Sequence, residues 1–133
     1  MPSPRMNVPT PVIGAPDPHV LGNLYAKLLD WNVVENDADW MAIEAPTGEG
    51  GSAPYALAFQ REQHWVRPVW PAVPGQQQMT MHLDIAVDDL KAGLAWALEL
   101  GATLAEFQPQ EQNLVLLDPA GNWVEISEIR RIV

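Results

Sequence analysis

The sequence of 133 residues contains no cysteine. A disulfide scaffold, a thiolate metal site and a cysteine nucleophile are therefore excluded. Basic residues are also scarce: 7 lysines and arginines stand against 17 aspartates and glutamates, which leaves a formal charge of −10. Nucleic acid and anionic membrane surfaces are unfavourable partners for such a chain, because each phosphate that is bound needs a Lys or Arg side chain. We expect neither kind of partner.

Long apolar runs are missing as well. No stretch approaches the roughly 20 apolar residues that cross a membrane, and residues 1–6 do not resemble a signal peptide. We therefore expect a cytoplasmic protein. The motifs of serine hydrolases, P-loop proteins and dinucleotide-binding proteins are also absent. The apolar fraction of 47 % is nevertheless typical of a chain that folds around a core.

Two stretches of the chain show the same order of predicted elements. In the first, a strand at 11–15 precedes a helix that begins at Asp17-Pro18, an N-cap followed by a proline at the first helical position. In the second, an alternating strand at 79–87 precedes a helix that we expect Asp88 to cap. The other strands are predicted at 33–35, 40–45, 55–60, 103–107, 113–117 and 122–127.

The spacing of these features indicates a duplication. Asp17 and Asp88 lie 71 positions apart, and so do Leu29 and Leu100. We predict an α+β protein of two βαβββ modules, because a unit of roughly 60 residues buries its sheet face poorly unless it is paired. The predicted boundaries within a single domain of residues 1–133 are about 11–62 for module one, 63–78 for a connection and 79–128 for module two.

Two segments resemble the vicinal oxygen chelate superfamily, which includes glyoxalase I, bleomycin-resistance proteins and extradiol dioxygenases. One is Ala15-Pro16-Asp17-Pro18 with the helix after it, and the other runs from His82-Leu83-Asp84 to Leu117-Asp118-Pro119-Ala120-Gly121-Asn122. The resemblance covers about residues 11–128. It implies that the modules pair into an open barrel-like cup, with the helices outside and a small-molecule ligand inside, and that the protein is a homodimer.

Strand parity in module two suggests a metal site. His82 alternates with Leu83, and Glu125 alternates with Val124, so both polar side chains point away from the helices. An imidazole nitrogen and a carboxylate oxygen suit one divalent ion, Zn, Fe, Mn or Ni. The resemblance places His82 and Glu125 at the family's ligand positions on the first and last strands. Glu125 is also our candidate catalytic residue, a carboxylate that moves a proton.

Module one departs from this pattern. The offset of 71 places Pro11 where His82 stands, and proline has no side-chain ligand. The counterpart of Glu125 falls near Ala58 or Gln60, and Gln60 is a candidate for a further ligand. Asp84 is another, although we expect it to be a hydrogen-bond partner of His82. An open catalytic site needs one of these residues, or one from a dimer partner, to be complete.

The chain has 6 tryptophans, which is many for its length. Trp123 shares the parity of Glu125, Trp70 lies in the connection, and Trp96 is expected in the core. Aromatic linings favour flat, apolar or cationic ligands through stacking and cation–π attraction. The candidate substrate-binding residues are Trp40, Gln60, Trp70, Asp84 and Trp123.

Three hypotheses for function remain open. The first is a metal-dependent glyoxalase-like lyase, isomerase or dioxygenase that acts on a small oxygenated substrate. The second is a metal-free resistance protein that binds an aromatic or cationic drug-like molecule. The third is a structural or regulatory dimer with a vestigial cavity. Pro11 favours the second over a standard glyoxalase, whereas the pair His82 and Glu125 favours the first.

Overall fold

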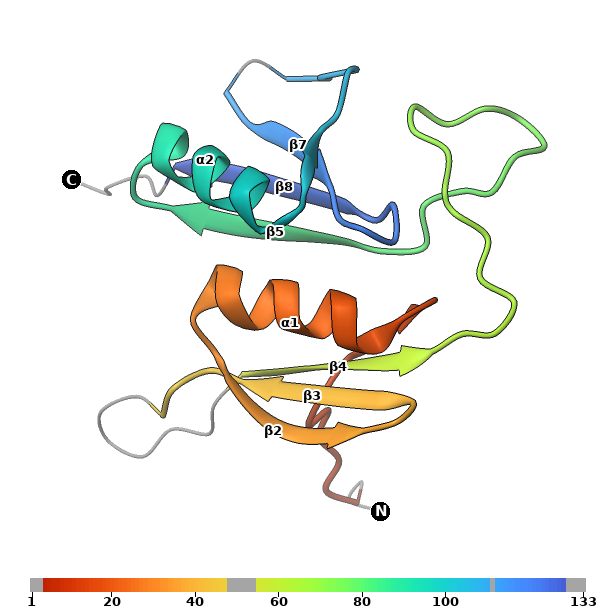
Figure 1. Cartoon of the computed structure of the whole chain (residues 1–133), viewed down its shortest axis with the longest axis vertical. Helices are drawn as coiled ribbons and strands as arrows, with labels where there is room; N and C mark the ends of the chain where they lie inside the picture. Colours follow the sequence, from red (N-terminus) through yellow and green to blue (C-terminus); the bar gives the residue numbers. More distant parts are fainter. Residues whose placement is uncertain (1–3, 48–54, 111, 129–133) are drawn as a thin grey trace. The chain divides into compact units, whose positions relative to one another are not determined.

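The computed structural model describes residues 4–47, 55–110 and 112–128. The chain forms two compact units, Met1–Gln63 and His64–Val133. Each unit is one helix on a face of a four-stranded mixed sheet (Figure 1). The predicted α+β fold with two βαβββ modules is therefore confirmed.

In the first unit, the edge strand β1 pairs in parallel with β4, and the other strand pairs are antiparallel. The order across the sheet is β1-β4-β3-β2. The elements of this unit are β1 (Val12–Ala15), α1 (Pro18–Leu29), β2 (Asn32–Asp37), β3 (Trp40–Glu44) and β4 (Ala56–Arg61).

The second unit repeats this topology. Its edge strand β5 pairs in parallel with β8, and the order across the sheet is β5-β8-β7-β6. The first and last strands of each unit are therefore hydrogen-bonded neighbours. The elements are β5 (His82–Val87), α2 (Leu90–Leu100), β6 (Thr103–Leu104), β7 (Leu114–Leu117) and β8 (Trp123–Glu128).

Helix α1 begins as its sequence predicts. The side chain of Asp17 accepts hydrogen bonds from the backbone N–H groups of His19 and Val20, and a proline follows at the first helical position. The helix packs its apolar face on the sheet, where the ring of Tyr25 stacks on Phe59 at 5.6 Å. Both rings are fully buried, so the core of the first unit lies between α1 and β4.

Helix α2 begins one residue later than expected. Its N-cap is Asp89, whose side chain accepts a hydrogen bond from the N–H of Ala92. Asp88 is therefore not the cap, and the spacing between the two caps, Asp17 and Asp89, is 72 positions. α1 has 12 residues and α2 has 11, so the spacing returns to 71 at the helix ends. The two acids at 88 and 89 are equivalent by local sequence, and the structure shows that the second one caps the helix.

Trp96 does not lie in the core as expected, since it is 43 % exposed on α2. The buried residue of this helix is the next one, Ala97. Successive residues of an α-helix are separated by about 100° around its axis, so a helix that turns Ala97 to the sheet leaves Trp96 at the side.

Strand β6 ends at Leu104, although its apolar pattern predicts a strand over 103–107. The side chain of Gln108 takes over the pairing with β7. Its Nε2 group donates to the carbonyls of Ala105 and Val115, at 2.7 and 2.9 Å, and its Oε1 accepts from the N–H of Val115 at 2.8 Å. A side-chain amide thus satisfies backbone groups that a longer strand would have paired.

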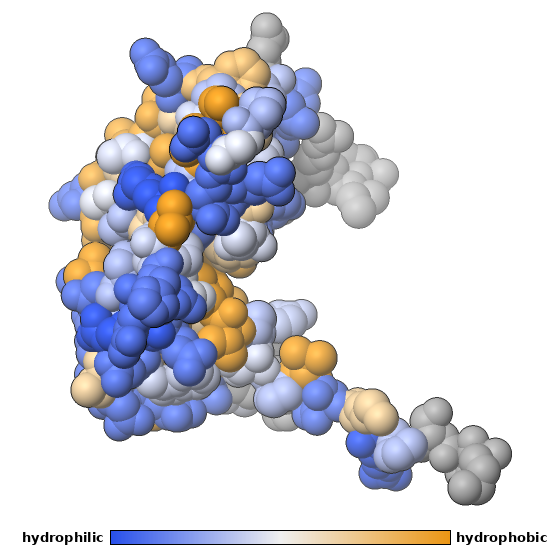
Figure 2. All heavy atoms as spheres, turned by 90° about the vertical axis from the view of Figure 1, so that its right-hand side faces the viewer, coloured by the Kyte–Doolittle hydropathy of each residue, from blue (hydrophilic) through white to orange (hydrophobic). Residues whose placement is uncertain are grey.

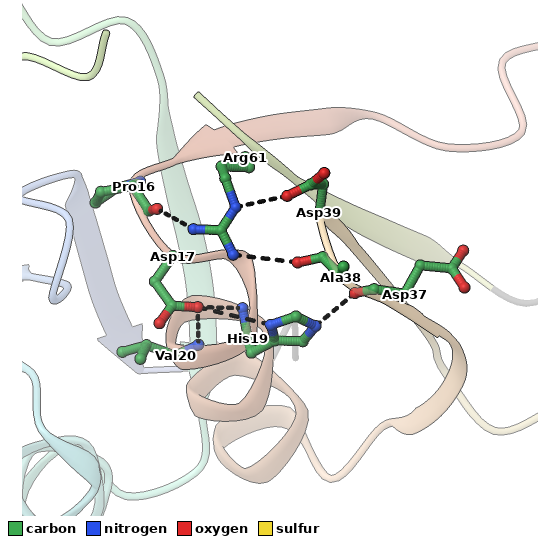
Figure 3. A network of polar contacts seen from close by, with 8 residues as sticks. All are labelled: Pro16, Asp17, His19, Val20, Asp37, Ala38, Asp39 and Arg61. Carbon is green, nitrogen blue, oxygen red and sulfur yellow. Dashed lines mark hydrogen bonds and ion pairs between the residues drawn. The ribbon is translucent and has the colours of Figure 1, made fainter. Parts of the chain in front are cut away.

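Arg61, at the end of β4, fastens the β2–β3 turn to the start of α1 (Figure 3). Its guanidinium donates to the carboxylate of Asp39 at 2.7 Å and to the carbonyls of Pro16 and Ala38 at 2.9 and 3.1 Å. Three acceptors from two separate loops are held by one planar group, which is a geometry that arginine provides.

The surface is polar over much of its area. On the side that carries the connection in Figure 1, hydrophilic residues predominate and hydrophobic residues are scattered among them (Figure 2). Among the described residues, none of the helices has the length and apolar character needed to cross a membrane.

Candidate functional site

Strands β5 and β8 present two rows of functional side chains on the face away from α2. Residues that pair across neighbouring strands project to the same face, and the register pairs His82 with Trp123 and Asp84 with Glu125. The residues between them project to the other face, where Val124 is buried. Four residues that the sequence singled out are therefore neighbours.

The imidazole of His82 lies between two functional groups. Its ring stacks on the indole of Trp123, with a centroid distance of 4.9 Å and an angle of 26°. Its Nε2 atom is 3.5 Å from Oδ1 of Asp84. About half of each side chain or more is exposed, at 49 % for His82 and 65 % for Asp84, so the outer side of this group is open to solvent.

Asp84 and Glu125 form an acid pair. Burial raises the pKa of Glu125, and the hydrogen bond with Asp84 and the charge of Asp84 raise it further, while His82 opposes the shift. Two adjacent negative charges repel each other, so the carboxylate of Asp84 disfavours the charged form of Glu125.

Aromatic rings extend the site beyond the strands. The indole of Trp70 lies 4.5 Å from that of Trp123 at an angle of 42°, and 5.9 Å from the ring of Phe107 at 58°. We call the four rings Phe107, Trp70, Trp123 and His82 the aromatic row. Phe107 is a member that sequence reasoning missed, because its position within an apolar stretch suggested an ordinary strand residue.

The connection holds Trp70 in place. We call residues 64–78 the strap. The indole N–H of Trp65 donates to the carbonyl of Ala120 at 3.1 Å, and Arg67 donates to the carbonyl of Pro119 at 2.9 Å. Both acceptors lie in the turn between β7 and β8, immediately before Trp123. The strap therefore belongs with the second unit, to which it contributes part of the site.

This turn is itself well fixed. The carboxylate of Asp118 is buried and accepts hydrogen bonds from the N–H groups of Ala120 and Asn122, at 2.9 and 3.0 Å. Gly121 has a φ of +89°, and a Cβ added there would lie 2.7 Å from Cγ of Arg67. A side chain at this position would push the strap away, so glycine permits the close approach.

In the first unit, the structure brings together two further predicted site residues. Trp40 on β3 and Gln60 on β4 are directly paired, and Gly14 pairs with Gln60 from the other side. The indole Nε1 of Trp40 is buried without a hydrogen-bond partner. Since the structure describes each unit by itself, convergence of this pair with the site on β5 and β8 stays a prediction, as does the shared cup.

The correspondence between the units differs from the one expected. Ile13 and Ile85 both precede their helix by the same number of residues, so the offset on these strands is 72 and His82 corresponds to Thr10 instead of Pro11. Through the strand pairing of Ile13 and Ile85, Glu125 corresponds to Ala58. Neither counterpart is a usual metal ligand, so the first unit does not repeat the His–Glu pair.

The donor groups of the second unit do not fit a metal centre as they stand. Within the described ranges, His, Asp and Glu side chains nowhere gather in a group of three that could hold an ion. Burial and the neighbouring Asp84 raise the pKa of Glu125, whereas a metal ligand has to be deprotonated. A divalent ion on His82 and Glu125 therefore stays a prediction that requires a further ligand and a rearrangement of the acid pair.

Comparisons with known proteins agree with this architecture. The model of the family described as glyoxalase-like domain matches residues 11–127. A glyoxalase/bleomycin resistance protein/dioxygenase family enzyme from Burkholderia phytofirmans PsJN is similar in structure, with a TM-score of 0.64 and 15 % identity over 92 % of this chain and 98 % of that one.

Two antibiotic-binding proteins are also similar in structure. The bleomycin-binding protein of Streptomyces verticillus has a TM-score of 0.56 and 18 % identity over 96 % of this chain and 100 % of its own. An antibiotic-binding protein from Streptomyces sp. CB03234 has a TM-score of 0.57 and 16 % identity over 95 % and 98 %. No curated protein matches the sequence. At these identities, the solved structures establish the fold alone.

Proposed function

We propose, from the premise that this chain belongs to the family of glyoxalase-like domains, that it binds a flat aromatic molecule that carries a positive charge, without a metal. The observation that carries the proposal is the aromatic row. Stacking between aromatic rings contributes about 0.5–1.5 kcal/mol per pair beyond the area that is buried. A ligand of two or three fused rings that contacts Trp123 and His82 gains several such contacts.

The acid pair supports the positive charge of the ligand. Asp84 and Glu125 lie two residues along the strands from His82 and Trp123, so a cationic group on a stacked ring system reaches their carboxylates. Asp84 is largely exposed and therefore accessible. The net charge of −10 adds a general attraction for cations.

The comparisons support a binding role to a limited extent. Two proteins of the same fold are described as binding bleomycin or another antibiotic. The fold is shared with enzymes as well, so this likeness supports binding only together with the aromatic row.

A titration with the fluorescent dye 9-aminoacridine, a three-ring cation near neutral pH, tests the proposal. We expect saturable binding at one site and much weaker binding of 9-anthracenecarboxylate, which has a similar ring system and a negative charge. Trp123→Ala and His82→Ala should each weaken binding about tenfold, which corresponds to about 1.4 kcal/mol. Trp96→Ala, on the helix side of the same unit, is the matched control and should bind like the wild type.

The proposal fails if neither dye binds, or if Trp123→Ala and Trp96→Ala have the same effect. Equal binding of both dyes would leave the aromatic row as a site but would contradict the role of the acid pair.

A metal-dependent enzyme is the second candidate, and the raised pKa of Glu125 favours it. Burial and the neighbouring Asp84 raise the pKa of this carboxyl group above its ordinary value, a direction that suits a group that moves a proton. Metal analysis of tag-free protein tests this candidate. Stoichiometric metal that is lost in both His82→Ala and Glu125→Ala would support it. Metal content that is the same in these variants would count against it. The homodimer implied by the family is tested by sedimentation equilibrium on the same samples.

A further inference from the structure

Trp70 is attached to the second unit less firmly than Trp65, which lies near the beginning of the strap. The indole hydrogen bond of Trp65 is partly buried, whereas the bond from Nε1 of Trp70 to the carbonyl of Phe107, also 3.1 Å long, is exposed. Water can replace an exposed hydrogen bond at little cost, but a partly buried one is costly to leave unmade. The segment around Trp70 can therefore separate from the unit while the strap stays anchored at Trp65.

The strap has a geometry that allows such a local movement. It contains no helix or strand, and its distal part forms a loop of its own, closed by a backbone hydrogen bond from Val69 to Gln77. This loop can move as a whole without breaking any strand pairing of the sheet. Gly75 at its tip has open space around it.

Trp123 has two ring neighbours, which differ in how firmly they are held. His82 is fixed beside it by the pairing of β5 with β8, whereas Trp70 reaches it from the strap. A flat ligand that stacks on Trp123 where Trp70 lies must take the place of this ring, which is tilted by 42° on Trp123. Trp70 is the ring that can leave.

We propose that Trp70 is an intramolecular competitor of the ligand and thereby determines specificity. It occupies on Trp123 the place of a flat ring system, and a ligand binds by displacing it. This inference rests on the proposed function. Because the ligand must stack better than an indole, the site selects polycyclic planar cations over single-ring amines.

Removing the competitor tests the inference. The Kd of 9-aminoacridine should fall about tenfold in Trp70→Ala, the factor that corresponds to one exposed hydrogen bond together with one ring contact. Trp70→Phe keeps a ring but loses the hydrogen bond, and its Kd should lie between those of the wild type and Trp70→Ala. Trp96→Ala is the control and should not change the Kd. An unchanged or raised Kd in Trp70→Ala overturns the inference, and a raised Kd makes Trp70 a wall of the site.

A measurement without ligand separates this inference from the proposed function. Protein labelled with 5-fluorotryptophan gives one ¹⁹F signal per tryptophan, and single Trp→Phe variants assign the signals. We expect exchange between two environments for Trp70 and Trp123, and a single environment for the anchored Trp65. If no dye binds to any variant, the proposed function fails. Two environments for Trp70 would then still support a displaceable ring, whereas a single environment would overturn it.

Discussion

At the scale of the residue, the environment of Glu125 in the candidate site affects the stability of the folded protein. Its pKa is raised by burial and by the hydrogen bond and charge of Asp84, so it holds a proton more tightly in the folded than in the unfolded protein. The stability that this provides is fully present below the unfolded pKa and is lost as the pH rises through the folded value. At neutral pH, the carboxylate of Glu125 therefore opposes folding.

Glu125→Gln should relieve this opposition. The amide is neutral and can still donate a hydrogen bond to Asp84, as the protonated acid does. We expect the variant to have a higher Tm than the wild type near pH 7 and no advantage near pH 4, in thermal unfolding followed by circular dichroism. Asp84→Asn is the companion variant and should also raise the Tm near pH 7. An advantage of Glu125→Gln that is as large near pH 4 would contradict the assigned cause.

Gly121 is the residue that lets the strap approach its turn. Gly121→Ala should lower the free energy of unfolding by about 1–2 kcal/mol because of its left-handed backbone, and further because the new Cβ meets Arg67. Gly75→Ala is the matched control, since Gly75 has a similar φ of +81° and no neighbour within 4 Å.

Urea unfolding of the two variants isolates the contact with Arg67. We expect Gly121→Ala to lower the free energy of unfolding more than Gly75→Ala does. Adding Arg67→Ala to Gly121→Ala should remove this extra loss. If Gly121→Ala and Gly75→Ala lowered the free energy of unfolding equally, the strap would move away from the new Cβ without a measurable cost.

At the scale of the element, the two helices differ in how closely one of their glycines approaches the neighbouring side chains. Gly22 of α1 faces the side chains of Met41 and Phe59, both fully buried, and an added Cβ would touch the sulfur of Met41 and lie 3.2 Å from Phe59. The side chain nearest to Gly93 of α2 is that of the half-buried Val87, whose Cγ1 would lie 3.1 Å from an added Cβ. The approach at Gly22 is therefore closer than the approach at Gly93.

The same substitution should therefore act differently in the two helices. Alanine stabilises a helix by about 1 kcal/mol relative to glycine. An added methyl group that overpacks the core costs about 1–3 kcal/mol. We expect Gly22→Ala to destabilise the protein and Gly93→Ala to be neutral or stabilising in urea unfolding. Gly22→Ala combined with Met41→Ala should recover part of the loss. A stabilising Gly22→Ala on its own would refute the close packing.

The order of the elements could be predicted because each depends on local patterns. The Asp17-Pro18 start, the leucines of α1 and the alternation of β5 are readable within a few residues. The cap of α2 was misplaced by one residue because two adjacent acids satisfy the local rule equally, so the local sequence does not distinguish them. The length of β6 was overestimated because the side chain of Gln108 takes the place of strand residues in the pairing with β7, which no periodic pattern of the sequence indicates.

The candidate site was only partly predictable for a related reason. Strand parity located His82, Asp84 and Glu125, since they alternate with buried residues along regular strands. The contact between Trp70 and Trp123 depends on the path of the strap, which has no periodic pattern and is set by hydrogen bonds from Trp65 and Arg67 to the β7–β8 turn. No local signal in the sequence specifies that path.

At the scale of the whole molecule, charge is the dominant feature. A net charge of −10 on a chain of 133 residues makes repulsion between carboxylates a general cost of folding. Raising NaCl from about 20 mM to about 500 mM screens this repulsion and should raise the Tm by a few degrees. KCl at the same concentrations should give the same rise, and sucrose of equal osmolality is the control. A Tm that falls with salt would mean that ion pairs such as Arg61–Asp39 outweigh the repulsion.

The parallel pairing of β5 with β8 has a consequence for biosynthesis. His82 leaves the ribosome roughly forty positions before Trp123, its partner across the strands. The N-terminal unit can acquire its core during that interval, since units of a chain tend to fold in the order in which they emerge. The surface that carries Trp123 and His82 is complete only after β8 has been translated, so a ligand of the proposed kind could stabilise nascent chains only from that point on.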